Sequence, residues 1–291
     1  MIIKRWPFFS IILLCLGFLA MLGSCNKSDR DDDVETLSAR DYALAHHIFD
    51  DAFRQVHRFA MGDTLLNDTS VKQSLDACLD RRTTSLSDTV AVFPLVLNLN
   101  YGDQGTPCYD NGLRYGRITA SFSGKYLNKG TIITFSFDGY RKDIYDVSGK
   151  LTVVNQGLNN EGRRYYTFII QEGLITGTNI NIQLGGTFSY QWVSGSSTET
   201  DFTDDVFEID SGMVAGRNSR GSSFTNEVTS KYTSDLTCPH FVSGRSYMQV
   251  QNLIDRTLNY GVITECDNIL ISRRNNTYLE VEIPIMQPEA F

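Results

Sequence analysis

Hydrophobic and polar residues alternate along most of the chain after residue 90, in the pattern of strands with one buried face. Segments 131–137 (TIITFSF) and 179–184 (NINIQL) are clear cases. Turn residues such as Asn128-Lys129-Gly130 separate the segments. The spacings between segments are too short to hold crossover helices, so neighbouring strands are expected to be antiparallel. The pattern predicts strands near 90–100, 115–125, 130–138, 144–155, 163–171, 178–193, 205–216, 221–232, 241–250, 254–260, 267–272 and 277–284.

These strands predict a mainly β fold, an antiparallel meander that forms a sandwich or a rolled sheet. We place this β domain at 90–291, with a possible division near 235 into a large and a small unit. Residues 62–89 are rich in Asp, Ser and Thr, and they are predicted to form a loop region with a short ordered piece near Cys78.

One segment, residues 38–61, has helical periodicity instead. Its apolar residues fall on one stripe at three- and four-residue spacing, so we predict an amphipathic helix that packs on the β domain or binds a partner. Ser38 is the expected N-cap, and Asp41 completes a capping box. We expect His46 and His57 to be solvated. They would lie about 16 Å apart along the helix axis, too far to share a metal ion.

The first 24 residues have the layout of an export signal, with Lys4 and Arg5 before an apolar run at 8–22. Leu22-Gly23-Ser24-Cys25 resembles a bacterial lipobox, so Cys25 is predicted to carry lipid such as palmitate after cleavage. A plain secretory signal and an uncleaved anchor are the alternatives. The apolar run is shorter than the ~20 residues that span a bilayer, and an acidic tether, residues 25–37, follows it.

Cleavage would remove two basic residues, leaving a formal charge of 24 − 34 = −10. An acidic chain without a basic block is a poor nucleic-acid binder, so we expect no nucleic-acid partner. Anionic lipid would also repel it. The expected membrane contact is therefore the lipid anchor itself.

A repeated tetrad, Leu-Asn-Tyr-Gly, occurs at 99–102 and again at 258–261. Each copy lies between two cysteines at nearly matching distances. The cysteines are Cys78 and Cys108 around the first copy, and Cys238 and Cys266 around the second. We interpret each copy as a strand entering a turn, with pairing Cys78–Cys108 and Cys238–Cys266. The other two connectivities remain open. The cysteines lack the C-x-x-C spacing of zinc or redox sites.

With these motifs in place, the chain resembles an uncharacterised family of Bacteroidetes-type lipoproteins. The resemblance rests on the lipobox with its acidic tether, the paired cysteine units, and segments 112–118 (GLRYGRI) and 204–209 (DDVFEI). It implies a β-rich, lipid-anchored protein of the outer membrane. Surface exposure is the favoured orientation, and a periplasm-facing orientation is the alternative.

The sequence contains no zinc-protease, P-loop or dinucleotide motif, so we assign no catalytic residue and no cofactor. His240, beside Cys238, is expected to be structural. Asp201, Asp204 and Asp205 could begin a calcium site, although a solvated strand edge explains them as well. Thr64 and Thr89 stand in short motifs that resemble O-glycosylation sites.

We therefore expect a non-enzymatic binding, adhesive or structural β module on the cell envelope. Its partner would be a glycan or an envelope protein. Two alternatives remain: an exported hydrolase acting on polysaccharide or peptide, and a carrier whose rolled sheet encloses a cavity for lipid.

Overall fold

The computed structural model of the chain describes residues 33–63, 65–66, 81–86, 92–108, 110, 112–198, 202–261 and 266–284. The chain divides into two compact units, Met1–Val34 and Glu35–Phe291. The second unit holds the helix and the sheet that are described below.

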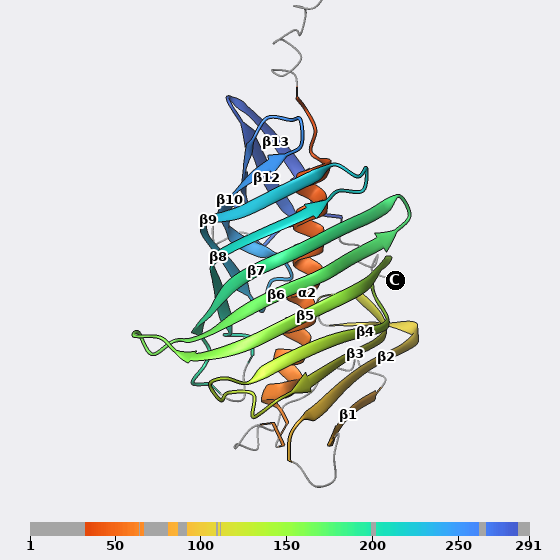
Figure 1. Ribbon diagram of the computed structural model, residues 1–291, viewed down its shortest axis with the longest axis vertical. Coiled ribbons are helices and arrows are strands. Elements are labelled where there is room, and N and C mark those ends of the chain that lie inside the picture. Colours follow the sequence, from red (N-terminus) through yellow and green to blue (C-terminus); the bar gives the residue numbers. More distant parts are fainter. Residues whose placement is uncertain are drawn as a thin grey trace, which may run out of the picture. The chain divides into compact units, whose positions relative to one another are not determined.

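Thirteen strands in the described part of the chain form one sheet, and each pairs antiparallel with the next strand in sequence (Figure 1). The strands are β1 (Arg81–Leu86), β2 (Leu95–Pro107), β3 (Leu113–Phe122), β4 (Ile132–Lys142), β5 (Tyr145–Leu158), β6 (Arg164–Gly177), β7 (Ile180–Ser194), β8 (Val206–Arg217), β9 (Ser223–Asp235), β10 (Phe241–Val250), β11 (Arg256–Asn259), β12 (Ile269–Arg274) and β13 (Thr277–Glu282). The predicted mainly β class and antiparallel meander are confirmed.

Two details of the predicted organisation need correction. Strand β1 lies inside the segment 62–89 that we predicted as a loop, and it pairs with β2 from Arg81↔Asn100 to Leu86↔Leu95. Its sequence, RRTTSL, lacks the alternation that marks the other strands. The sheet also continues through the possible division near 235, because Ser234 of β9 pairs with Phe241 of β10.

Helix α2 (Leu37–Met61) lies within the curve of the sheet, and the strands cross it obliquely (Figure 1). It contacts β2, β7, β10 and β13, which lie far apart in the strand order. All but three of its 25 residues are buried. The single sheet is therefore rolled around the helix, which decides between the two predicted architectures.

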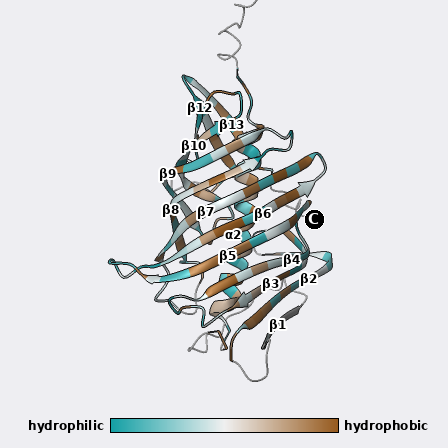
Figure 2. Ribbon diagram, viewed as in Figure 1, coloured by the Kyte–Doolittle hydropathy of each residue, from teal (hydrophilic) through white to brown (hydrophobic). Residues whose placement is uncertain are grey.

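Apolar positions of the strands face the helix, and polar positions alternate with them (Figure 2). Phe53 of α2 occupies the middle of the core. Its ring meets Phe168 of β6 and Phe207 of β8 edge-on, at centroid distances of 4.7 and 5.4 Å. Such pairs add about 0.5–1.5 kcal/mol each beyond the area that they bury. The sheet and the helix thus share one core.

The start of the helix differs from the predicted capping box. The N-cap is Thr36, which makes no capping hydrogen bond through its side chain. The two predicted capping residues instead hold the turn between β8 and β9. Asn218 Nδ2 donates to Ser38 Oγ at 2.9 Å, and the Ser219 amide donates to Asp41 Oδ2 at 2.7 Å. Both residues thus bind the β8–β9 turn instead of forming the predicted capping box, and Ser38 also donates to the nearby carboxylate of Glu35.

Glu35 fixes the chain just before the helix. Its main-chain oxygen accepts hydrogen bonds from Arg256 Nη1 at 2.6 Å and from Arg274 Nη1 at 3.1 Å. Its carboxylate also pairs with Arg256 at 2.7 Å. The entry to the helix is therefore held by side chains of β11 and β12.

The two copies of the Leu-Asn-Tyr-Gly tetrad have the same local structure. Asn100 Oδ1 accepts from the Gly102 amide at 3.0 Å, and Asn259 Oδ1 accepts from the Gly261 amide at 3.2 Å. Both glycines have positive φ angles, 72° and 92°. The predicted chain reversal is wrong at the first copy, because β2 continues past Gly102 through a change of register.

The disulfide Cys238–Cys266 is present and confirms that predicted pair. Cys108 is also disulfide-bonded. Cys78, its predicted partner, lies outside the described residues, so the pairing Cys78–Cys108 stays a prediction.

Candidate functional site

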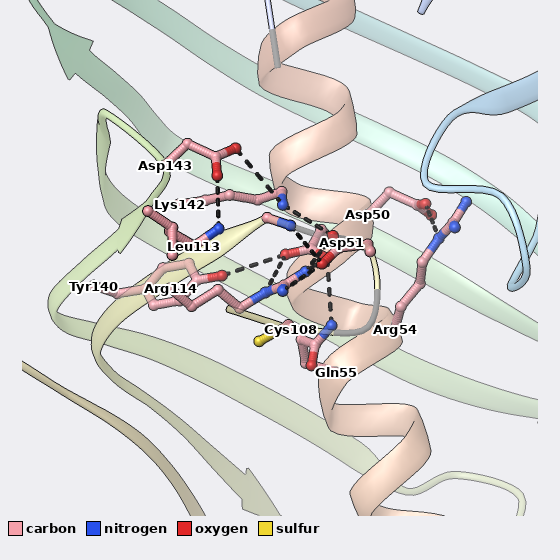
Figure 3. A network of polar contacts seen from close by, with 12 residues as sticks. Asp50, Asp51, Arg54, Gln55, Cys108, Leu113, Arg114, Tyr140, Lys142 and Asp143 are labelled. Atoms are coloured by element: carbon pink, nitrogen blue, oxygen red, sulfur yellow. Dashed lines mark hydrogen bonds and ion pairs between the residues drawn. The ribbon is translucent and has the colours of Figure 1, made fainter. Parts of the chain in front are cut away.

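Helix α2 carries many polar side chains into the interior of the protein. The largest group links the helix to β3 and β4 (Figure 3). Arg114 Nε donates to Asp51 Oδ2 at 3.1 Å, and its Nη1 donates to Asp110 Oδ1 at 2.8 Å. Lys142 Nζ lies 3.0 Å from Asp110 Oδ2. This buried ion network joins three separate parts of the chain.

Opposite charges compensate for burial within this network. Burial opposes the charge on Asp110, but Arg114 and Lys142 outweigh it and hold the pKa of that carboxyl well below its usual range. Burial also opposes the charge on Arg114, yet Asp51 and Asp110 raise the pKa of its guanidinium. The network thus stays charged, and its partners satisfy one another. Its role is therefore structural, because it links the helix to β3 and β4.

A second group has the residue types of a proton relay. His57 Nδ1 lies 2.6 Å from the Tyr126 hydroxyl, and His57 Nε2 lies 3.0 Å from Asp205 Oδ2. Trp192 Nε1 donates to the other oxygen of Asp205 at 2.9 Å. Each of the four residues is at most 2% exposed. A substrate has no exposed reacting atom to reach here, so we interpret this group as structural support.

The remaining histidines are also internal. His46 Nε2 lies 3.1 Å from the Tyr190 hydroxyl, and burial lowers the pKa of His46 to about 3. His47 stacks against His240 with ring centroids 5.5 Å apart. Burial, and then the neighbouring His240, lowers the pKa of His47, while burial lowers that of His240 to about 4. The expectation that His46 and His57 are solvated is wrong, because both side chains are buried against rings of the sheet, His46 against Phe188 and His57 against Phe207.

The acidic segment before β8 also departs from the prediction of a solvated edge. Asp205 is buried and accepts hydrogen bonds from two ring nitrogens, as described above. Asp204 accepts from Thr198 Oγ1 at 2.6 Å. Asp201, the third candidate calcium ligand, lies outside the described residues. Within the described ranges, no group of three or more potential ligands is placed to hold a metal ion.

Exposed hydrogen-bonding side chains gather on another part of the sheet, around a groove of about 950 Å³. The groove runs across β6–β10. Its exposed lining includes three amides, two carboxylates and one guanidinium, which belong to Gln183, Gln249, Gln251, Glu172, Asp255 and Arg217. Unlike the buried networks, these groups are accessible to a ligand.

The strand register explains why the surface of the sheet has a groove across β6–β10. Gly185 of β7 pairs with Ala215 of β8, Ala215 pairs with Thr225 of β9, and Thr225 pairs with Gln249 of β10. Three of these four side chains are short or missing. One row of the sheet thus forms a low floor between rows of longer side chains.

Longer side chains flank this row on both sides. The next row on one side holds Met213, Glu227 and Tyr247, which pair in that order and lie outside the lining of the groove. On the other side, Gln183 pairs with Arg217, and both residues line the groove. The groove is therefore a consequence of pairing between side chains that are distant in sequence.

Hydrogen bonds hold one end of the groove in place. The Tyr247 hydroxyl and Gln249 Nε2 both donate to Asp255 Oδ2. At the other end, Glu172 has a positive φ of 52°, where the register of β6 and β7 shifts between Ile170 and Gly173. The irregularity brings Glu172 into the lining of the groove.

Several predicted site residues cannot be placed. The lipidation residue Cys25 and the candidate glycosylation residues Thr64 and Thr89 lie outside the described residues, so these assignments stay predictions. Sequence reasoning missed the groove entirely. Its only local signal is the pair Gly185-Gly186 in the middle of a strand, where glycine is unfavourable and indicates an irregularity or a close approach.

Comparisons with known proteins add no assignment. No protein-family model matches the chain, and no match is found among curated proteins or solved structures. Among the described residues, no helix has both the length and the apolar character needed to cross a bilayer.

Proposed function

We propose that this protein is a non-enzymatic binding protein of the bacterial envelope, attached by lipid at Cys25 and displayed on the cell surface. Its binding site is the groove across β6–β10. The groove supports this proposal because accessible hydrogen-bonding side chains gather there around a hollow.

The arrangement of the interior favours a binding function over the two alternatives, a hydrolase and a lipid carrier. The four histidines and the relay-like carboxylate Asp205 are buried, which disfavours their use in hydrolysis. The space enclosed by the sheet is occupied by helix α2, which disfavours a lipid carrier. Fold alone does not assign function, so the proposal rests on the groove.

Binding and turnover can be separated in one experiment. The full-length protein in detergent is titrated with oligosaccharides and with short peptides, and each mixture is then analysed for cleavage products. We expect saturable binding without products. Formation of products would identify an enzyme, and binding that is unaffected when the groove is filled would place the site elsewhere.

A further inference from the structure

The groove also indicates a class of ligand, and this step rests on the proposed function. We infer that the groove binds a neutral oligosaccharide that lies across the strands. The direction of the groove, the chemistry of its lining and its charge support this inference.

The direction of the groove argues against a peptide added to the sheet. Peptides that extend a sheet pair with the backbone of an edge strand. Here β6–β10 are interior strands of the sheet, each with a neighbour on both sides. Their backbone groups are already used, so a ligand must be recognised by side chains.

The side chains around the groove suit sugar hydroxyls. Each hydroxyl both donates and accepts hydrogen bonds, and an amide offers donors and an acceptor in one plane. Gln183, Gln249 and Gln251 supply three such amides, and Thr225 adds a hydroxyl on the floor. Tyr247 lies in the row next to the floor, outside the lining, and its hydroxyl holds the lining residue Asp255 in place.

The charge of the lining argues against an anionic ligand. Glu172 and Asp255 contribute two negative charges and Arg217 one positive charge. Glu227 adds a further carboxylate in the adjoining row. A phosphorylated or uronic-acid chain would meet net repulsion, whereas a neutral chain would not.

The length of the groove suits a short chain of sugars. It crosses five strands, which at a spacing of about 4.8 Å gives about 19 Å between the axes of β6 and β10. A monosaccharide would leave most of this lining unused. We therefore expect affinity to rise with the number of sugar units until the groove is filled.

The test fills the groove without disturbing the sheet. A Cβ atom added at Gly185 would meet only the Ile170 carbonyl, at an ordinary 3.5 Å. Gly185→Tyr and Ala215→Trp should therefore fold while blocking the floor. Ser136→Tyr is the matched control, because Ser136 is exposed on β4, away from the groove. Circular dichroism and urea unfolding check that all variants are folded.

The probes are tetrasaccharides of β-1,4-linked glucose, xylose and N-acetylglucosamine and of α-1,4-linked glucose. Tetragalacturonate serves as the anionic probe, and a neutral decapeptide as the peptide probe. Calorimetry with the full-length protein should detect binding of at least one neutral tetrasaccharide. We expect Gly185→Tyr and Ala215→Trp to weaken it at least about tenfold and Ser136→Tyr to leave it unchanged. Affinity should be nearly the same at about 0.05 and 0.5 M salt, because no charge on the ligand is screened.

The outcomes separate this inference from the proposed function. If only tetragalacturonate or the peptide binds, and the groove variants abolish that binding, the ligand class is wrong and the binding function stands. Neutral-sugar binding that the groove variants leave intact contradicts the assigned site. If no probe binds, both the ligand class and the binding function are overturned.

Discussion

Asp51 of helix α2 and Arg114 of β3, 63 residues apart in sequence, form a two-pronged ion pair inside the sheet. The side chain of Arg114 is fully buried and that of Asp51 is 4% exposed. Arg114 also binds Asp110 through two of its nitrogens. One guanidinium thus connects the helix to the loop before β3.

Removing that guanidinium should destabilise the fold strongly. Arg114→Leu leaves the buried carboxylate of Asp51 without its counter-charge and leaves Asp110 with Lys142 alone. Breaking a buried ion pair in this way typically costs about 3–5 kcal/mol. The control is Arg117→Leu, because Arg117 lies on the same strand and pairs with Asp138 at the surface, with exposures of 46% and 70%. An exposed pair contributes about 1 kcal/mol or less. Urea unfolding should show this difference, and equal losses would contradict a buried network.

Acid should destabilise the protein through its buried histidines. Burial lowers the pKa of His46 to about 3 and that of His240 to about 4, against 6.5 for the unfolded chain. Between these values and pH 6.5 the unfolded state binds more protons than the folded state. The free energy of unfolding therefore falls as pH falls through this window.

His240→Gln tests this pH dependence. A pKa for His240 that falls from 6.5 in the unfolded chain to about 4 in the folded protein corresponds to about 3 kcal/mol. The variant should therefore lose less stability than the wild type between pH 7 and pH 4. Asp50 and Asp143, whose pKa values are raised by burial, act in the opposite direction, but they are present in both proteins. Parallel stability profiles from urea unfolding would show that His240 does not titrate as expected.

The Cys238–Cys266 disulfide should contribute measurably to stability. It joins residues 28 apart in sequence, and closing a loop of that size is worth about 3–4 kcal/mol in the unfolded-chain model. A Cys238→Ser/Cys266→Ser double variant should unfold at a correspondingly lower urea concentration. Mass spectrometry of the unreduced wild type would also test Cys78–Cys108. Any other partner for Cys108 would refute that predicted pair.

Lipid attachment is tested by Cys25→Ser. A lipid-anchored protein partitions into detergent and labels with radioactive palmitate, because the acyl chains supply the membrane affinity. The variant should lose both properties while keeping the folded unit, which begins at Glu35. Unchanged membrane attachment in the variant would favour an uncleaved N-terminal anchor.

The sequence predicts the strands well because each carries its own signal. Alternation in segments such as 131–137 places one face in water and the other in the core, whatever the neighbouring strands are. The tetrads 99–102 and 258–261 likewise encode a local bond between Asn and Gly, which both copies form. Strand β1 carries no such alternation and was missed.

The buried networks and the groove could not be predicted in this way. Polarity at His57 indicates exposure to water unless its partner is known, and that partner, Asp205, lies 148 residues away. The groove depends on the register that sets Gly185, Ala215 and Thr225 side by side. A single sequence does not specify that register. Both features are thus properties of pairing between distant segments.

The contacts of Arg256 and Arg274 with Glu35 would have a mechanical consequence if the protein is anchored at its N-terminus, as proposed. A pull on the chain ahead of this residue reaches its main-chain oxygen, which Arg256 and Arg274 grip from two strands. The load passes to β11 and β12 before it can unwind the first turn of the helix. If the chain is anchored through Cys25 as proposed, tension on the anchor would thus reach the sheet through these two arginines as well as through the helix.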